Sequence, residues 1–222
     1  MPGRFSLYQD LTVKENLNFF ATVFNTTIEE NYDLIKDIYQ QIEPFKTRRS
    51  GKLSGGMKQK LALSCALIHK PSVLFLDEPT TGVDPVSRKE FWEMLKKLKE
   101  QGITIIVSTP YMDEATLCDR IALIQHGKIL SIETPGKIIA DYPKKLYSVE
   151  SDNNYNLLEQ LRKSASVDSV YMFGDCLHIT FKEKVDSSIP GLKEIKPSVE
   201  DCFINLMITT TPKSPKGDFG KR

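Results

Sequence analysis

The sequence predicts an α/β protein with a parallel sheet, followed by a small α+β domain. Residues 73–76 form a continuous apolar run and residues 103–107 are apolar except for Thr104, which is typical of strands buried in a parallel sheet. A helical pattern lies between them, and this alternation of strands and helices favours the parallel arrangement. Beyond Tyr142 and Pro143 the order changes to strand, helix, strand and strand, which predicts the smaller domain.

The composition is that of an ordinary globular protein, because 40% of the residues are apolar and 27% are charged. The formal net charge of +1 gives no reason to expect nucleic acid or anionic lipid as a partner. The apolar runs are far shorter than the roughly 20 residues of a membrane-spanning helix. The first residues also lack the pattern of a signal peptide, so we expect the chain in the cytoplasm.

The cysteines are far apart and form no C-x-x-C pair. This spacing favours reduced core thiols of a cytosolic protein over a disulfide or zinc framework. The four residues are Cys65, Cys118, Cys176 and Cys202.

The N-terminal part is predicted to be mostly helical. Residues 12–15 form a capping-box pattern, and apolar residues follow them at helical spacing. A second amphipathic helix is predicted over 28–42, before Pro44. A glycine-rich loop over 50–56 then leads into a third predicted helix over 57–69.

The next part alternates helices and strands. Asp84 and Pro85 are a typical start of a helix, and apolar residues share one face of the helix that follows. These apolar residues are Phe91, Met94, Leu95 and Leu98. A short helix is predicted over 112–117, and two more strands of the same alternating pattern are predicted over 121–124 and 129–132.

The smaller domain is predicted to begin with a strand at Leu146 and a helix over 154–162. Two further strands are predicted over 167–173 and 177–181, with a hairpin turn at 174–175 between them. We expect structural roles and no chemistry in this domain.

Asp77 and Glu78 are the first candidates for chemistry. Paired acids at the carboxyl end of a buried strand lie where open α/β sheets bind ligands. An aspartate there holds Mg²⁺ through water, and the adjacent glutamate orients or deprotonates the attacking water in phosphoryl transfer. The alternative is that the two acids are solvated residues at the start of a loop.

Ser54, Gly55 and Gly56 are the second candidates. A serine and two glycines at a helix N-terminus expose backbone N–H groups and the positive end of the helix dipole to an anion. The alternative is that these residues are only a helix cap.

The order of several short segments is more specific than either site alone. Residues 5–8 and 15–17 precede the loop over 53–57, and 82–85 and 111–115 follow the paired acids. Over roughly residues 1–140 this order resembles the ATP-binding subunit of ABC transporters. The C-terminal segments at 173–178 and 197–203 resemble the extra domain of multidrug-export and antibiotic-resistance subunits.

The resemblance implies a partial ABC-type P-loop NTPase fold, with a helical signature subdomain and a small α+β C-terminal domain. Residues 1–141 would be the nucleotide-binding domain without its P-loop portion. The implied parts are a helical subdomain over 11–70, a Walker B core over 71–141 and an accessory domain over 142–208. The residue pattern itself predicts a last helix capped by Ser198, and the Thr-, Pro-, Lys- and Gly-rich composition predicts a disordered tail over 209–222.

The same resemblance implies the roles of the site residues. Ser54, Gly55 and Gly56 would form the signature loop that covers the γ-phosphate of ATP bound to a second nucleotide-binding domain. On this chain's own nucleotide, Asp77 would hold Mg²⁺ through water and Glu78 would act on the hydrolytic water. The D-loop residue Asp84 would couple the two ATP sites.

The implied partners are a second nucleotide-binding domain, in the same or a different chain, and membrane-spanning permease subunits that contact residues 6–15. The implied function is ATP hydrolysis that energises export, most often of drugs or other small molecules. We therefore expect a cytoplasmic protein that lies on the inner face of the cell membrane through its permease. The transported substrate depends on that partner.

The sequence departs from the family pattern in three places. No G-x-x-x-x-G-K-[ST] pattern occurs, so we expect the chain to lack the P-loop and to be inactive alone. Gly3 stands where the family usually has the Q-loop glutamine, and Pro110 stands where it has the switch histidine. None of the histidines is expected to replace that residue: His69, His126 and His178.

Two other functions stay open. The first is a truncated or degenerate subunit that hydrolyses nothing and only docks on, or completes, the ATP site of a partner. The second is a soluble ABC protein of translation or repair, although residues 57–72 leave no room for the long coiled-coil insertion typical of that class.

Overall fold

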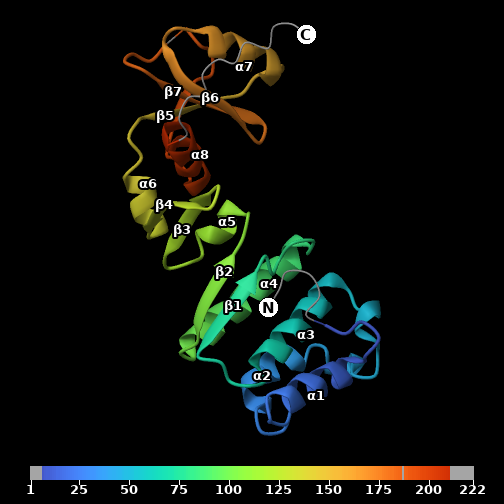
Figure 1. Cartoon of the computed structure of the whole chain (residues 1–222). Coiled ribbons are helices and arrows are strands. Elements are labelled where there is room, and N and C mark those ends of the chain that lie inside the picture. The colour runs from blue at the N-terminus through green and yellow to red at the C-terminus, as the bar shows by residue number, and fades with distance from the viewer. Residues whose placement is uncertain (1–6, 187, 211–222) are drawn as a thin grey trace, which may run out of the picture. The chain divides into compact units, whose positions relative to one another are not determined.

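The computed structural model describes residues 7–186 and 188–210. Contacts within the chain divide it into two compact units, Met1–Tyr111 and Met112–Arg222 (Figure 1). None of the helices within the described residues has the length and apolar composition needed to cross a bilayer.

The first unit begins with two helices that differ in how well the sequence predicted them. Helix α1 (Val13–Val23) starts at the predicted capping box, with Thr12 as its N-cap. Helix α2 (Tyr32–Tyr39) is shorter than the predicted 28–42. The carboxylate of Glu30 accepts hydrogen bonds from Thr26 Oγ1 and Thr27 N, and this local turn competes with helix at residue 28.

Helix α3 (Gly55–Leu67) lies between the other helices of the first unit and packs against α1 and α2. Two short 3₁₀ turns, η1 (Glu43–Phe45) and η2 (Ser50–Lys52), precede it. Helix α3 begins two residues earlier than predicted because Ser54 caps it.

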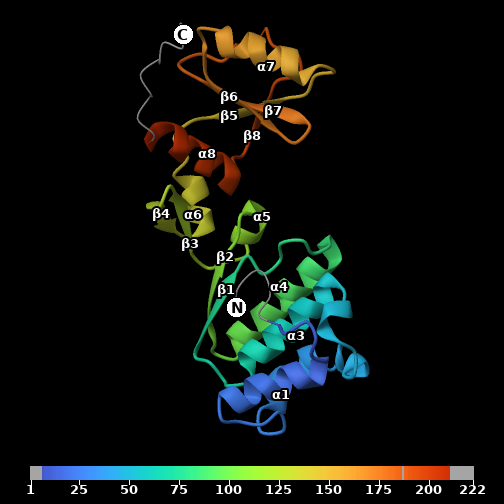
Figure 2. The ribbon, with the colours of Figure 1, turned by 45° about the vertical axis from the view of Figure 1, so that its right-hand side comes forward.

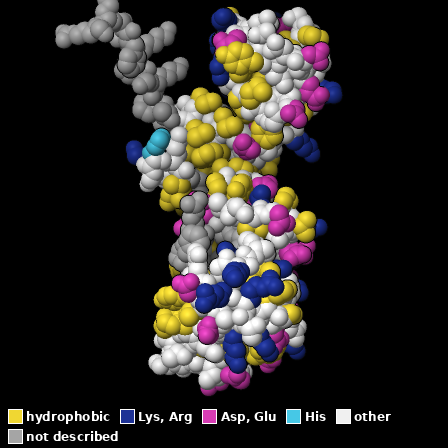
Figure 3. Space-filling view, turned by 90° about the vertical axis from the view of Figure 1, so that its right-hand side faces the viewer, with side chains coloured by type: hydrophobic (Ala, Val, Ile, Leu, Met, Phe, Trp, Pro, Cys, Tyr) yellow, Lys and Arg dark blue, Asp and Glu magenta, His cyan; other side chains and the backbone are white. Residues whose placement is uncertain are grey.

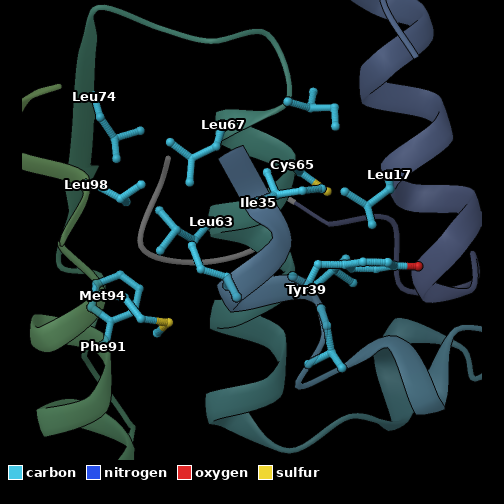
Figure 4. Packing of buried hydrophobic residues seen from close by; sticks show 14 of the residues in the cluster. Leu17, Ile35, Tyr39, Leu63, Cys65, Leu67, Leu74, Phe91, Met94 and Leu98 are labelled. Atoms are coloured by element: carbon cyan, nitrogen blue, oxygen red, sulfur yellow. The ribbon is translucent and has the colours of Figure 1, made fainter. Parts of the chain in front are cut away.

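Strands β1 (Val73–Asp77) and β2 (Thr104–Ser108) pair in parallel, as predicted. Helix α4 (Pro85–Glu100) connects them, and Asp84 is its N-cap. The four predicted apolar residues of α4 are buried, and Figure 4 shows three of them facing the side chains of α3 and β1. The core of this unit is formed by side chains of α1, α2, α3 and α4 and by one face of the β1–β2 sheet.

The expectation that β1 is buried on both faces is wrong for the described residues. Leu74 and Leu76 are buried, whereas Phe75 is 62% exposed and Ile106 of β2 is 50% exposed. The side chains of a strand alternate between its two faces, and the helices of this unit cover only one of them.

The second unit begins with α5 (Met112–Ala115), followed by β3 (Ile121–Gln125), β4 (Lys128–Glu133) and α6 (Pro135–Ala140). Strands β3 and β4 pair antiparallel with each other, which corrects their assignment to a parallel alternating pattern. Only two residues connect them, and such a short connection permits a hairpin but no parallel crossover.

A four-stranded antiparallel sheet in the order β6-β7-β5-β8 also belongs to the second unit (Figure 2). Its elements are β5 (Leu146–Val149), α7 (Asn154–Lys163), β6 (Val167–Phe173), β7 (Cys176–Phe181) and β8 (Lys193–Ile195). The hairpin turn at Gly174 is confirmed, and β8 was not predicted.

Helix α8 (Val199–Thr210) follows the predicted cap at Ser198. Its residues Val199 and Cys202 pack with Ile121 and Ile138, which come from β3 and α6. The predicted boundary between residues 141 and 142 falls inside this unit and stays a prediction. Of the predicted tail, Thr209 and Thr210 are the last residues of α8, and 211–222 lie outside the described residues.

Candidate functional site

The carboxyl ends of β1 and β2 bring Asp77, Glu78 and Ser108 together. Ser108 Oγ donates a hydrogen bond to Asp77 Oδ1 over 2.6 Å. The backbone N–H of Glu78 donates to Ser108 O at 3.0 Å and to Ser108 Oγ at 3.1 Å. One serine therefore fixes both the carboxylate of Asp77 and the backbone of Glu78.

Glu78 has a backbone φ of +44°, in the left-handed region that side-chain-bearing residues seldom occupy. This conformation costs on the order of 1–2 kcal/mol for a residue with a Cβ atom. The turn after Glu78 supports it, because Thr81 N donates to Glu78 O and Thr81 Oγ1 donates to Glu78 Oε2, each at 3.2 Å. Strain of this kind is found mostly where a functional residue must be held in one position.

The residues at the strand ends fit Mg²⁺ bound through water. Asp77 and Glu78 are both exposed, and the hydrogen bond from Ser108 engages only one oxygen of Asp77. No cluster of three or more potential ligand side chains occurs within the described residues. Mg²⁺ keeps several waters and takes one or two carboxylates plus phosphate oxygens, and the carboxylate of Asp77 is a ligand of this kind.

The predicted signature loop, Ser54 to Gly56, lies at the N-terminus of α3. Ser54 Oγ accepts a hydrogen bond from Met57 N at 3.4 Å, so Ser54 is the helix cap, and Ser54 and Gly55 are exposed. The first N–H groups of the helix and the positive end of its dipole therefore face outward, as an anion site requires.

Gly56 is buried against the start of α4. A Cβ atom at this position would lie 2.7 Å from Ser87 Oγ, so only glycine fits without movement of Ser87. A Cβ atom on Gly55 would lie 3.5 Å from Gly82 O, which is an ordinary contact. The loop predicted as the signature loop and the segment predicted as the D-loop are therefore packed against each other within one chain.

Asp84 caps α4, and its Oδ1 accepts a hydrogen bond from Ser87 N at 3.0 Å. Hydrogen bonds from the backbone and the side chain of Ser87 hold the pKa of Asp84 below its usual range. Asp84 therefore stays ionised at neutral pH, and its negative charge stabilises α4 by interacting with the positive end of the helix dipole.

The remaining predicted positions do not join this site. Pro110 is exposed beyond the end of β2, and Gly3 lies outside the described residues. His69 stacks on Phe24 with a ring separation of 4.0 Å, and His126 lies in the β3–β4 turn. The cysteines are reduced thiols, and Cys65 and Cys202 are buried as core residues, whereas Cys118 and Cys176 are only partly buried.

His178, in the second unit, forms a buried network with Asp201. His178 Nδ1 lies 2.7 Å from Asp201 Oδ1, and Tyr171 Oη donates to the same oxygen at 2.7 Å. Ser198 N and Oγ donate to Asp201 Oδ2, each at 2.7 Å. This network joins the cap of α8 to β6 and β7, so His178 has a structural role.

Sequence reasoning missed Ser108 and Asn16. Ser108 follows the apolar run of β2 just as Asp77 follows that of β1, and this matching position was the available signal. Asn16 is fully buried, its side chain accepts from Tyr8 N at 2.9 Å, and its Nδ2 lies within 3.2 Å of the carbonyl oxygens of Tyr8, Leu11 and Thr12. Nothing in its spacing distinguishes it from an exposed helical asparagine.

Comparisons with known proteins agree with the geometry. The pattern of the ABC transporter family matches residues 2–81. The chain is 36% identical over 231 residues to the probable multidrug ABC transporter ATP-binding protein YbhF of Escherichia coli, with 98% of this chain and 40% of that protein covered. It is 40% identical over 212 residues to the Nod factor export ATP-binding protein I of Burkholderia thailandensis, with 90% of this chain and 69% of that protein covered.

Solved structures show the same fold. CbiO1 of Clostridium perfringens, part of the ABC transporter complex cbiONQ, is 29% identical to this chain, and the two structures match with a TM-score of 0.53. The match covers 61% of this chain and 55% of CbiO1. An ATP-binding subunit of an ABC transporter is 26% identical and matches with a TM-score of 0.54. This match covers 61% of this chain and 58% of that subunit. The chain spans less than half the length of YbhF and about two thirds of the Nod factor export protein. Its similarity to these proteins and the arrangement of its site residues show that the chain belongs to the family of ABC transporter ATP-binding proteins.

Proposed function

We propose that the chain is an ATP-binding and ATP-hydrolysing subunit that energises an ABC-type exporter of drugs or other small molecules. The observation that carries this proposal is the arrangement at the ends of β1 and β2, where Ser108 holds the carboxylate of Asp77 and the backbone of Glu78 together. The names of the relatives, which describe multidrug and Nod factor export, support the direction of transport.

Each site residue then has one task. Asp77 holds a water of the Mg²⁺ shell, and Glu78 accepts a proton from the attacking water and orients it. The metal ion, when bound, neutralises charge on the phosphate oxygens. Ser54, Gly55 and Gly56 direct a hydroxyl and backbone N–H groups at the γ-phosphate of an ATP molecule held by a second nucleotide-binding domain.

The proposed assembly is a pair of nucleotide-binding domains on membrane-spanning permease subunits, at the cytoplasmic face of the membrane. Asp84 lies on the same closely packed surface as the signature loop, because Gly56 contacts Ser87 in the turn that Asp84 caps. This packing supports a coupling role for Asp84, since a shift of one loop displaces the other. The domain division over 1–141 and 142–208 belongs to the same proposal.

Gly3 and Pro110 favour an asymmetric pair. Both occupy positions at which the family reads the γ-phosphate, and neither side chain donates a hydrogen bond or binds a metal. In such a pair this chain completes the partner's ATP site with its signature loop, while its own site turns over slowly. The alternative is a subunit that hydrolyses nothing and only completes the site of a partner.

The experiment is affinity purification of the chain from membranes, followed by measurement of ATP turnover. We expect membrane-spanning subunits to be retained and the complex, but not the chain alone, to hydrolyse ATP. Glu78→Gln tests the alternative, because a loss of turnover on this substitution assigns hydrolysis to this chain's own site. Failure of the wild-type chain to retain a membrane-spanning subunit would overturn the proposal.

A further inference from the structure

The segment that follows β2 is held in place by its own residues. The ring of Pro110 fixes the φ angle of this residue at about −65° and restricts Thr109, which precedes it, to extended conformations. The backbone N–H of Tyr111 donates a hydrogen bond to Thr109 Oγ1 at 3.1 Å. Tyr111 therefore sits on a locally fixed segment that directly continues the end of β2, where Ser108 Oγ donates to Asp77.

The ring of Tyr111 lies against the guanidinium group of Arg88 in α4. Arg88 Cζ is 4.2 Å from the centroid of the ring, and both residues are partly buried. A guanidinium group in this position is attracted by the negative potential of the ring face. Lys and Arg side chains are common on the face of the first unit that Figure 3 shows. Charge alone therefore does not distinguish Arg88, whereas its stacking on Tyr111 does.

Arg88 belongs to the first turn of α4, and this turn contacts the predicted signature loop. The backbone N–H of Arg88 donates to Asp84 O at 2.9 Å. The preceding residue, Ser87, lies so close to Gly56 that a Cβ atom on Gly56 would be 2.7 Å from Ser87 Oγ. Closely packed contacts have low compressibility and transmit small displacements. A shift of Arg88 would therefore also move the start of α3.

We propose that Tyr111 and Arg88 are positioning residues that hold the predicted signature loop in a fixed relation to the acids at the end of β1. Tyr111 is attached to the strand end that carries Ser108, and Arg88 is attached to the helix start that packs on Gly56. Their stack joins these two parts of the chain. The inference rests on the proposed function, in which the acids and the signature loop act on ATP.

Pro110 has a definite part in this arrangement. It stands where the family pattern has the switch histidine, and it has no side-chain hydrogen-bond donor that could replace that residue. Its fixed φ angle instead limits the movement of Tyr111 relative to the end of β2. The residue that departs from the family pattern thus keeps the ring of Tyr111 in contact with Arg88.

The test is ATP turnover of the complex that contains the full chain, purified from membranes. Tyr111→Leu and Arg88→Met each remove one half of the stack. Each is expected to lower kcat by about fivefold or more, because small displacements of groups around the reacting phosphate cost rate. The double variant is expected to be no slower than the slower single variant, since either substitution already breaks the contact. Losses that multiply would show independent roles and would overturn the inference.

Fluorinated rings at position 111 separate stacking from simple packing. Tyr111→Phe keeps the ring and is expected to keep most of the activity. Analogues of this variant with one, two or three fluorine atoms on the phenylalanine ring have a weaker negative potential on the ring face at nearly the same size. Their kcat is therefore expected to fall with each added fluorine. Equal kcat across the series would assign Tyr111 to packing and contradict the inference.

Lys89→Met is the matched control, because Lys89 is an exposed cation beside Arg88 on α4. Its kcat is expected to equal that of the wild type. Thermal unfolding is measured for each variant, and kcat is calculated per assembled complex, so that loss of folding is not counted as loss of rate. If Tyr111→Leu does not assemble, the fluorinated series decides the question, because its members keep the shape of the ring.

The outcomes separate this inference from the proposed function. If the wild-type complex does not hydrolyse ATP, the proposed function fails. If the wild-type complex hydrolyses ATP and both Tyr111→Leu and Arg88→Met match its kcat, the positioning inference is overturned while the proposed function stands.

Discussion

Gly56 at the start of α3 lies so close to Ser87 at the start of α4 that a Cβ atom on Gly56 would be 2.7 Å from Ser87 Oγ and 3.0 Å from Ser87 Cβ. The two helix N-termini, one capped by Ser54 and the other by Asp84, are therefore packed together. Gly56 has a packing role in this chain in addition to any contact of its N–H group with phosphate.

Replacement of Gly56 by alanine is expected to lower the free energy of unfolding by about 1–3 kcal/mol, because the added methyl group overpacks the contact with Ser87. Gly55→Ala is the matched control, since its Cβ atom meets the nearest atom, Gly82 O, at 3.5 Å. Chemical denaturation of both variants measures the difference. Equal stability of the two variants would show that Ser87 moves aside without cost.

Asn16→Ala is expected to lower the free energy of unfolding by about 1–3 kcal/mol, because it leaves the N–H group of Tyr8 and carbonyl groups of the 8–12 loop without the buried side chain that binds them. Asn18→Ala on the same helix is the control, since Asn18 is exposed. Hydrogen exchange at Tyr8 N is expected to be faster in Asn16→Ala. Unchanged exchange there would contradict the proposed anchoring of the loop.

The sequence predicted the local features of the first unit well, because each depends on neighbouring residues. The capping box at Thr12, the cap at Asp84 and the parallel strands β1 and β2 follow from short patterns. The predicted start of α2 was wrong because the Glu30 turn uses side-chain hydrogen bonds that compete with helix. The pattern of apolar residues does not reveal that competition.

The site was predicted in part for a similar reason. Asp77 and Glu78 stand out because they follow an apolar run, but the hydrogen bond to Ser108 joins residues 31 positions apart. The contact of Gly56 with Ser87 and the network around Asp201 also depend on tertiary packing. Such contacts cannot be deduced from spacing in one sequence.

Ser108→Ala is expected to reduce ATP turnover at this chain's own site by about tenfold, because misplacement of a catalytic carboxylate costs rate even when binding is retained. Ser108→Thr keeps the hydroxyl group in a strand that tolerates β-branched residues, and it is expected to keep most of the activity. Turnover measured over a range of ATP concentrations separates kcat from KM. A change in KM alone would contradict a positioning role.

Asp201→Asn is expected to destabilise the second unit by about 3 kcal/mol, because it removes the charged partner from a buried, fully hydrogen-bonded network. Glu200→Gln, one residue earlier and exposed, is the control. Thermal unfolding followed by a probe in β6 or β7 measures the loss. A difference of less than half this size would show that the network contributes little.

The same network predicts an effect of pH on stability. Burial alone would raise the pKa of Asp201, but hydrogen bonds from Ser198, Tyr171 and His178 hold it below its usual value. The stabilisation from Asp201 is therefore present above the unfolded-state pKa of about 3.9 and is lost as the pH falls through the lower folded-state value. The acid loss of stability is expected to be less steep in Asp201→Asn, and equal slopes would contradict this assignment.

ATP turnover of the purified complex that carries Ser54→Asp, compared with Ser54→Asn, tests the central claim most directly. Both replacements are good helix caps, so α3 keeps its start. Only aspartate places a negative charge where the signature loop is proposed to meet the γ-phosphate. We expect turnover of the Asp variant to fall about tenfold or more below that of the Asn variant. Equal turnover of the two variants, at the wild-type rate, would contradict the claim that this loop acts on bound ATP.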